Sequence, residues 1–300
     1  MAGTKEIKSH MSSVRDTRKI TNAMYLIAST KMRKAKEELD KSRPYFEALK
    51  GEIKRIFRTS ENVSSKYFYP PDGSGTLNGT YGCLVITADK GLAGAYNQNV
   101  IKETERLMKE HPDTKLFVVG EYGRQYFLRH HIPIERSFLY TAQNPTMQRA
   151  REISGLLLER FNSGQLEKIF VVYTDLQNGL KEETQCTRLL PFHRAHFASA
   201  AEEQAAVRFE FTPSIEEVLN AVMPSYVSGF IYSALVDSFC SEQNARIEAM
   251  SAANGNAEEI LDELSVQYNR VRQANITREI TEISSGARAQ RRSAAEGKAK

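Results

Sequence analysis

Residues 7–39 read IKSHMSSVRDTRKITNAMYLIASTKMRKAKEEL, and apolar side chains recur along them at alternating spacings of four and three. This spacing gathers the side chains on one stripe of an α-helix, which is the heptad pattern of a coiled coil. Pro44 interrupts the pattern, but the stripe resumes at Phe46, so we expect a single kinked helix over residues 1–57. The stripe comprises Ile7, Met11, Val14, Tyr25, Ala28, Met32, Ala35, Leu39, Phe46, Leu49, Ile53 and Ile56.

The C-terminal part of the chain carries a second stripe with the same spacing. We expect a short helical run between Pro213 and Pro224, followed by a long helix from near Tyr226 to Gly286. Such a helix spans roughly 90 Å, whereas a compact chain of this length is about 50 Å across, so we expect both helices to project. Each stripe needs a partner, and the two predict an antiparallel coiled coil whose two seam asparagines fix the register. The second stripe comprises Ile247, Met250, Asn254, Ala257, Leu261, Leu264, Tyr268, Val271 and Asn275.

Composition limits the classes of protein to which the chain can belong. Of its 300 residues 41% are hydrophobic and 26% are charged, and no run approaches the ~20 apolar residues of a membrane span. Three separated cysteines and the lack of a signal-peptide pattern indicate reduced thiols in a cytosolic compartment. Residues 1–57 hold 14 lysines and arginines against 7 acidic residues. That balance fits a solvated helix face, an anionic membrane or an acidic protein collar, but few aromatic residues interleave, which disfavours nucleic acid.

Residues 81–212 have a different pattern, in which short apolar runs alternate with helical segments. This alternation predicts a Rossmann-like α/β domain with a mostly parallel sheet. Strands are expected at CLVIT (83–87), KLFVVG (115–120), KIFVVYTDL (168–176), RLLP (188–191) and VRFEF (207–211), and helices at 97–109, 122–129 and 145–162, with Pro145 in the first turn. The expected divisions are an N-terminal coiled-coil helix (1–57), a linker (58–80), the α/β domain (81–212), a C-terminal coiled-coil helix (213–286) and a tail (287–300).

No motif in the chain indicates an active site. ADKGLAGAYN (88–97) lies between a strand and a helix, where phosphates bind, but it matches neither GxGxxG nor GxxxxGK[ST]. A tight turn that needs glycine explains it better than a phosphate site. His193 and His196 have a ligand-like spacing without a cysteine or carboxylate set beside them. We therefore expect no catalytic residue, no metal and no bound cofactor.

The last predicted helix changes character near its end. After Asn275 the apolar stripe moves by one residue to Ile276, Ile280 and Ile283. An end with apolar and small hydroxyl side chains is suited to an apolar sleeve in which it can turn with few fixed hydrogen bonds. The alternative is an ordinary helix end with Gly286 just past its last turn. The small hydroxyl residues are Thr277, Thr281, Ser284 and Ser285.

Both ends of the chain resemble gamma subunits of rotary F-type ATP synthases, of the bacterial type. The resemblance rests on IKSHMSSVRDTRKITNAMYLIASTKMRKAKEEL (7–39), VITADKGLAGAYNQNV (85–100), SEQNARIEAMSAANGNAEEILDEL (241–264) and NRVRQANITREITEISSGARA (269–289). It implies a central rotor shaft that transmits torque between a membrane ring of c subunits and a hexamer of alpha and beta subunits. ATP synthesis is then coupled to proton or sodium transport, and the shaft itself is not catalytic.

The resemblance also implies roles for particular residues. Met24 would face the beta subunit, and Phe211 would lie on the side of the ring and the epsilon subunit. The residues expected to contact the alpha/beta hexamer are Met24, Arg246, Arg272, Gln273, Ile276, Ile280 and Ile283. The chain lacks the paired cysteines of the chloroplast redox insertion, so thiol control is not expected.

Two other functions remain open from the residues alone. One is an enzyme whose α/β domain binds a nucleotide at the Gly91–Gly94 loop, with the helices as oligomerisation arms. The other is a coiled-coil scaffold or membrane-surface adaptor that uses the basic first helix. For the rotor shaft, the expected location is the cytoplasmic face of the cell membrane, as a peripheral protein.

Overall fold

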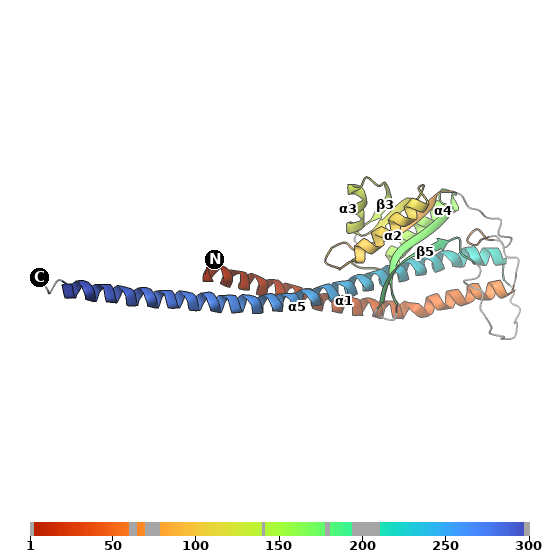
Figure 1. Ribbon diagram of the computed structural model, residues 1–300. Coiled ribbons are helices and arrows are strands. Elements are labelled where there is room, and N and C mark those ends of the chain that lie inside the picture. The colour runs from red at the N-terminus through yellow and green to blue at the C-terminus, as the bar shows by residue number, and fades with distance from the viewer. Residues whose placement is uncertain are drawn as a thin grey trace. The chain divides into compact units, whose positions relative to one another are not determined.

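The computed structural model describes residues 3–59, 65–69, 79–139, 142–177, 181–193 and 211–296 (Figure 1). The first and the last elements of the chain are long helices, and the remaining elements lie between them in the sequence. The elements in order are α1 (Thr4–Thr59), β1 (Tyr81–Ile86), α2 (Tyr96–Glu110), β2 (Lys115–Val119), α3 (Glu121–Arg129), β3 (Ile134–Phe138), α4 (Met147–Asn162), β4 (Lys168–Gln177), β5 (Lys181–Leu190) and α5 (Ile215–Glu296).

The chain divides into two compact units, each containing part of both long helices. The first unit, here the coil unit, is Met1–Leu26 with Ala249–Lys300. The second, here the sheet unit, is Ile27–Glu248. The predicted combination of an antiparallel coiled coil with an inserted α/β domain is confirmed.

In the coil unit, α1 and α5 run antiparallel, with the predicted seam between them as far as Val271. Asn275 lies past the start of α1, so its predicted role in fixing the register is wrong. The seam positions of both helices are buried or half-buried, whereas their neighbours are mostly exposed. Arg18 and Thr21 fill the gap that the apolar pattern leaves between Val14 and Tyr25. Thr21 Oγ1 donates to the amide oxygen of Asn254, so this seam asparagine has a polar partner across the coil, as a register-fixing residue requires.

In the sheet unit, the same two helices pack closely. A Cβ atom added to Gly229 of α5 would lie 2.0 Å from the Phe46 ring of α1, so only glycine allows this approach. Farther along, the Cys240 thiol lies 4.0 Å from the Met32 carbonyl oxygen. Pro44 lies inside α1, as predicted.

The sheet has the strand order β3-β2-β1-β4-β5, with four parallel strands and β5 antiparallel at one edge. Successive side chains of β1 alternate between two hydrophobic cores. Leu84 and Ile86 join the core formed with α1, α4 and α5. Cys83 and Val85 join the core formed with α2 and α3. The predicted Rossmann-like α/β domain is therefore confirmed, with one helix-covered core on each face of the sheet.

The predicted break at Pro224 is wrong, because α5 is one helix from Ile215 to Glu296 with Pro224 inside it. Proline removes one helical hydrogen bond, and the flanking residues Leu219, Met223 and Val227 are buried, so packing offsets that loss. The predicted end at Gly286 is also wrong, since the helix continues for ten more residues. A glycine inside a helix costs only about 1 kcal/mol.

Four smaller points differ from the expectations drawn from the sequence. Pro145 precedes α4, and Thr146 is its N-cap, accepting from the Arg149 amide. Strand β3 was not expected at all, and the RLLP strand is the end of the longer β5. Within the expected linker, residues 65–69 are described and pack on the core through Tyr67 and Phe68. The VRFEF strand before Phe211 lies outside the described residues.

One segment of α5 is long and apolar enough to cross a membrane by length and composition alone, which the sequence reading did not anticipate. Half of that segment is buried inside the protein. The core helix of a soluble protein has the same character.

Candidate functional sites

The exposed end of α5 in the coil unit is the first candidate site. Arg18 pairs with Glu258 at 3.0 Å, and Thr21 with Asn254, so the antiparallel register places Thr4, the first residue of α1, near Val271. Beyond that point α5 continues without α1 beside it (Figure 1). The side chains of Ile276, Ile280 and Ile283 are 46%, 62% and 73% exposed. We call these three residues the terminal apolar stripe.

An apolar stripe without a partner among the described residues indicates a surface for another molecule. Arg272 and Gln273, predicted contact residues, lie one turn before the stripe and are also exposed. Thr281 donates its hydroxyl to the backbone carbonyl of Thr277, so the Thr281 hydroxyl is turned back onto the helix. The site can therefore supply apolar contact and two exposed polar side chains.

A second exposed apolar surface lies on α1. Ile20 is 62% exposed and Met24 is half-buried one turn later. Ile27, one turn farther along α1, is 56% exposed. These residues lie beside the heptad seam and not within it, which is the pattern of a helix with more than one partner.

The carboxyl ends of β1 and β4 form the second candidate site, because there the strand order reverses. In open α/β sheets such a switch point is the usual place for a ligand. Here α5 occupies it. The pairing of β4 with β1 ends before Thr174, so no strand bonds the backbone of Thr174 on that side. Ser238 Oγ accepts from the Thr174 N–H at 3.3 Å instead. Ser241 Oγ donates to the Thr174 carbonyl, also at 3.3 Å. Two serines of α5 thus complete the hydrogen bonding of the strand.

Arg246 connects α5 to the glycine loop at the same switch point. It is only 9% exposed, pairs with Glu242 one turn earlier, and donates from Nη2 to the Gly91 carbonyl at 3.1 Å. Burial raises the pKa of Glu242, and the Arg246 guanidinium partly offsets that rise. A buried pair of this kind is sensitive to the loss of either member. We call Ser238, Ser241, Glu242 and Arg246 the α5 clamp.

The glycine loop is held in place by hydrogen bonds to α2, to α3 and to the α5 clamp. Asn97 Oδ1 accepts from the Ala88 amide at 2.9 Å, and Asp89 Oδ1 accepts from the Glu121 amide at the start of α3 at 2.9 Å. The other oxygen of Asp89 is buried without a hydrogen-bond partner among the described residues. Because α5 fills the crevice, the loop is better explained as a packing element than as a phosphate cradle.

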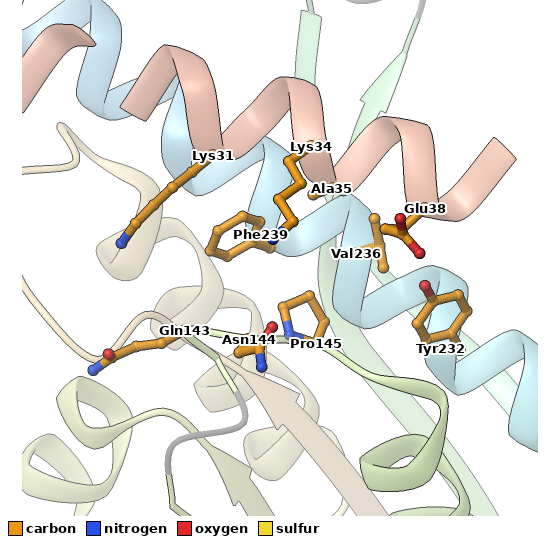
Figure 2. A pocket seen from close by; sticks show the side chains of 10 residues that line it. All are labelled: Lys31, Lys34, Ala35, Glu38, Gln143, Asn144, Pro145, Tyr232, Val236 and Phe239. Atoms are coloured by element: carbon orange, nitrogen blue, oxygen red, sulfur yellow. The ribbon is translucent and has the colours of Figure 1, made fainter. Parts of the chain in front are cut away.

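A cavity of about 240 Å³ in the sheet unit lies between α1, α5 and the loop before α4. Figure 2 shows Lys31 and Lys34 extending from α1 on the side opposite Gln143 and Asn144. Glu38, the one carboxylate among the described lining residues, pairs with Lys41 at 2.7 Å, and that hydrogen bond lowers the pKa of Glu38. Among the described lining residues there is neither a nucleophile with a base beside it nor a set of metal ligands.

The predicted contact residues therefore lie in different surroundings. Arg272, Gln273 and the terminal apolar stripe are exposed, whereas Arg246 is buried and bonded within the chain. Phe211 packs against the main core of the sheet unit. His193 stacks on Tyr69 at 4.8 Å, and His196 lies outside the described residues. Sequence reasoning missed Ser238 and Ser241, because small polar residues on a long helix give no signal of their own.

Comparisons with known proteins identify the family of sequences that share this architecture. The family model described as ATP synthase matches residues 3–290. The chain is 42% identical to an ATP synthase gamma chain of Caldanaerobacter subterraneus subsp. tengcongensis, over 95% of this chain and 99% of that one. It is 35% identical to a sodium ion specific ATP synthase gamma chain of Acetobacterium woodii, over 95% and 97%.

A solved structure supports the fold independently. A chain of the Euglena gracilis mitochondrial ATP synthase, from a structure of OSCP, F1 and c-ring in rotational state 3, superposes with a TM-score of 0.67. The match covers 96% of this chain and 94% of that one at 16% identity. Identity at this level indicates a shared fold and no more.

Proposed function

Because the chain belongs to the ATP synthase gamma-chain family, we propose that it is the central rotor shaft of a rotary ATP synthase. It transmits torque between a membrane ring of c subunits and a hexamer of alpha and beta subunits, without catalysing the reaction itself. The single observation that carries this proposal is the terminal apolar stripe, whose side chains are exposed in a chain that otherwise pairs its helical seams.

The terminal apolar stripe fits the role of a shaft end in an apolar sleeve. Full burial of an isoleucine side chain contributes about 1.5–3 kcal/mol, so three largely exposed isoleucines supply substantial, non-directional attraction. Apolar contact has no preferred angle about the helix axis, unlike a fixed set of hydrogen bonds. Arg272 and Gln273 would then make the polar contacts that depend on rotational position, as the family resemblance implies.

The α5 clamp fits the role of a torque connection. A single ion that crosses 100 mV supplies only about 2.3 kcal/mol, so several crossings must be accumulated without slippage between sheet and helix. Ser238 and Ser241 attach α5 to β4, and Arg246 attaches it to the glycine loop. Buried hydrogen bonds to the backbone resist sliding better than apolar contact alone, because displacement leaves polar groups unpaired.

The remaining parts of the proposal concern location and partners. The sheet unit would lie toward the c-ring and the epsilon subunit, with Phe211 on that side, on the cytoplasmic face of the membrane. Met24 would lie toward the beta subunit. Arg246 would lie toward the alpha/beta hexamer and would reach a partner only if it changes its bonding to Glu242. Support for these assignments comes from the family membership and from the exposed apolar stripe on α1.

Cross-linking in the assembled complex tests the rotor proposal. Arg272→Cys is paired with a cysteine on the beta subunit, after replacement of the half-buried Cys186 by serine. Bridge formation should stop multi-turnover ATP hydrolysis, and reduction of the same sample should restore it. Hydrolysis that continues undiminished with the bridge fully formed would refute the proposal. The reduced variant is the control for any effect of the substitution itself.

A further inference from the structure

A second cavity of the sheet unit has the chemistry of a cation-binding site. It encloses about 400 Å³ between α1 and α5, beside β4, and so falls within the size of small-ligand pockets. Three aromatic residues and three carboxylates are among its lining residues. The family comparison assigns no role to it.

Aromatic side chains from both long helices form its apolar walls. Phe46 of α1 packs directly on the α5 backbone at Gly229. Phe230 meets Tyr173 edge-on at 6.2 Å, and Tyr226 meets Phe192 edge-on at 5.5 Å. Phe230 and Tyr226 are therefore held in position by rings outside the cavity, and Phe46 by the backbone of α5. Fixed aromatic rings attract organic cations through their electron-rich faces.

Two aspartates supply the negative charge, Asp237 from α5 and Asp175 from β4. Ser233 Oγ donates to Asp237 Oδ2 at 3.2 Å. Neither aspartate forms an ion pair with any residue that the structure describes. Burial, and secondarily the charge of Asp175, raise the pKa of Asp237 to about 6. The two carboxylates are thus poorly compensated by the residues that the structure describes.

The positive groups near the cavity do not remove this deficit. Arg43 and Lys50 of α1 line it, with Glu47 between them, and Lys36 lies near enough to act on Asp237. Arg43 and Lys36 lower the pKa of Asp237, but burial and Asp175 outweigh them. The Arg43 side chain is 68% exposed and lies 3.8 Å from Asp40, so its charge is largely directed to solvent.

We propose that this cavity binds a small organic cation with an apolar body, an alkylammonium or arylalkylammonium ion. The ammonium group lies between Asp175 and Asp237, and the apolar body lies against Phe46, Tyr226 and Phe230. Such a ligand contacts α1, α5 and β4 together, so its binding stabilises the packing of the sheet unit. The site is independent of the rotor proposal, since it is defined within one chain.

The test uses the full chain with 2-(4-fluorophenyl)ethylammonium as probe and 2-(4-fluorophenyl)ethanol as its neutral analogue, both followed by ¹⁹F NMR line broadening. A probe of this size is expected to bind with a dissociation constant on the order of 1 mM. The neutral analogue should bind at least tenfold more weakly. Affinity for the ammonium should rise between pH 5 and pH 7.5, because Asp237 becomes ionised over that range.

Two variants and a matched control make the test specific. Asp237→Asn should weaken ammonium binding at least tenfold and abolish its pH dependence, whereas Asp262→Asn, at an exposed position of the same helix, should change it less than twofold. Phe46→Leu should also weaken binding, and it keeps both carboxylates. Equal binding of the ammonium and the alcohol, or equal effects of the two aspartate variants, would overturn the proposal. Circular dichroism checks that each variant is folded.

Discussion

Replacement of Arg246 by methionine should destabilise the sheet unit through the carboxylate that it leaves behind. Glu242 is 7% exposed and pairs with Arg246, which also donates to the Gly91 carbonyl. Removing one member of a buried pair costs about 3–5 kcal/mol. For a unit of this size, 1 kcal/mol corresponds to about 2–4 °C in melting temperature, so the expected decrease is roughly 10 °C.

The pH dependence of this loss identifies its cause. Burial already raises the pKa of Glu242, and removing the guanidinium raises it further. A carboxyl group whose folded-state pKa lies above its unfolded value adds stability at low pH and loses it as pH rises through the folded value. The difference in unfolding free energy between Arg246→Met and wild type should therefore be smaller at pH 5 than at pH 8.

Denaturant unfolding of the full chain, followed by circular dichroism, measures both effects. The double variant Glu242→Leu/Arg246→Met removes the unpaired carboxylate as well. Its unfolding free energy should lie only about 1–3 kcal/mol below that of wild type, which is the cost of leaving the Gly91 carbonyl unpaired. Arg272→Met, at an exposed position of the same helix, is the matched control and should change stability by at most about 0.5 kcal/mol. A single variant that loses less than 1 kcal/mol, or equals the double variant at every pH, would refute the reasoning.

Three further substitutions test other parts of the account. Thr21→Val leaves the Asn254 amide without its partner and should cost about 1–2 kcal/mol in the full chain, whereas Thr21→Val/Asn254→Leu should recover that loss in a double-mutant cycle of urea unfolding. Gly120→Ala should lower the free energy of unfolding by about 3 kcal/mol or more, because φ at this position is +96° and the new Cβ would lie 2.2 Å from the Thr87 carbonyl oxygen. The control Gly255→Ala, at a helical position with open space around it, should raise it by about 0.5–1 kcal/mol in the same assay. Met24→Lys should reduce the number of ions pumped per ATP in the assembled enzyme, since it adds a cation to a half-buried apolar position; an unchanged ratio would argue against a hexamer contact there.

The heptad seam was predictable because periodicity records which face of a helix is buried. The residues that fill the gap in this seam were not predictable, because Arg18 and Thr21 are polar. They contribute to the seam only through their polar partners on α5, Glu258 and Asn254. Pro224 was misread because local propensity favours a break there, and burial of its neighbours overrides that preference.

The sheet was predictable where its strands are buried on both faces and therefore continuously apolar. Strand β3 has no such run, because it is an edge strand and its side chains are half-buried or exposed. The α5 clamp was also beyond sequence reasoning. Ser238 and Ser241 act through a strand edge that becomes free only where β1 ends, and that position is a property of the assembled sheet.

Single-molecule recording tests the rotor proposal most directly. The alpha/beta hexamer is fixed to a surface, and a bead is attached to the chain through Arg136→Cys, an exposed position on β3, in a variant whose Cys186 is serine. On addition of ATP the bead should turn stepwise and in one direction. A bead that stays at a fixed angle while the same particles hydrolyse ATP would contradict the account.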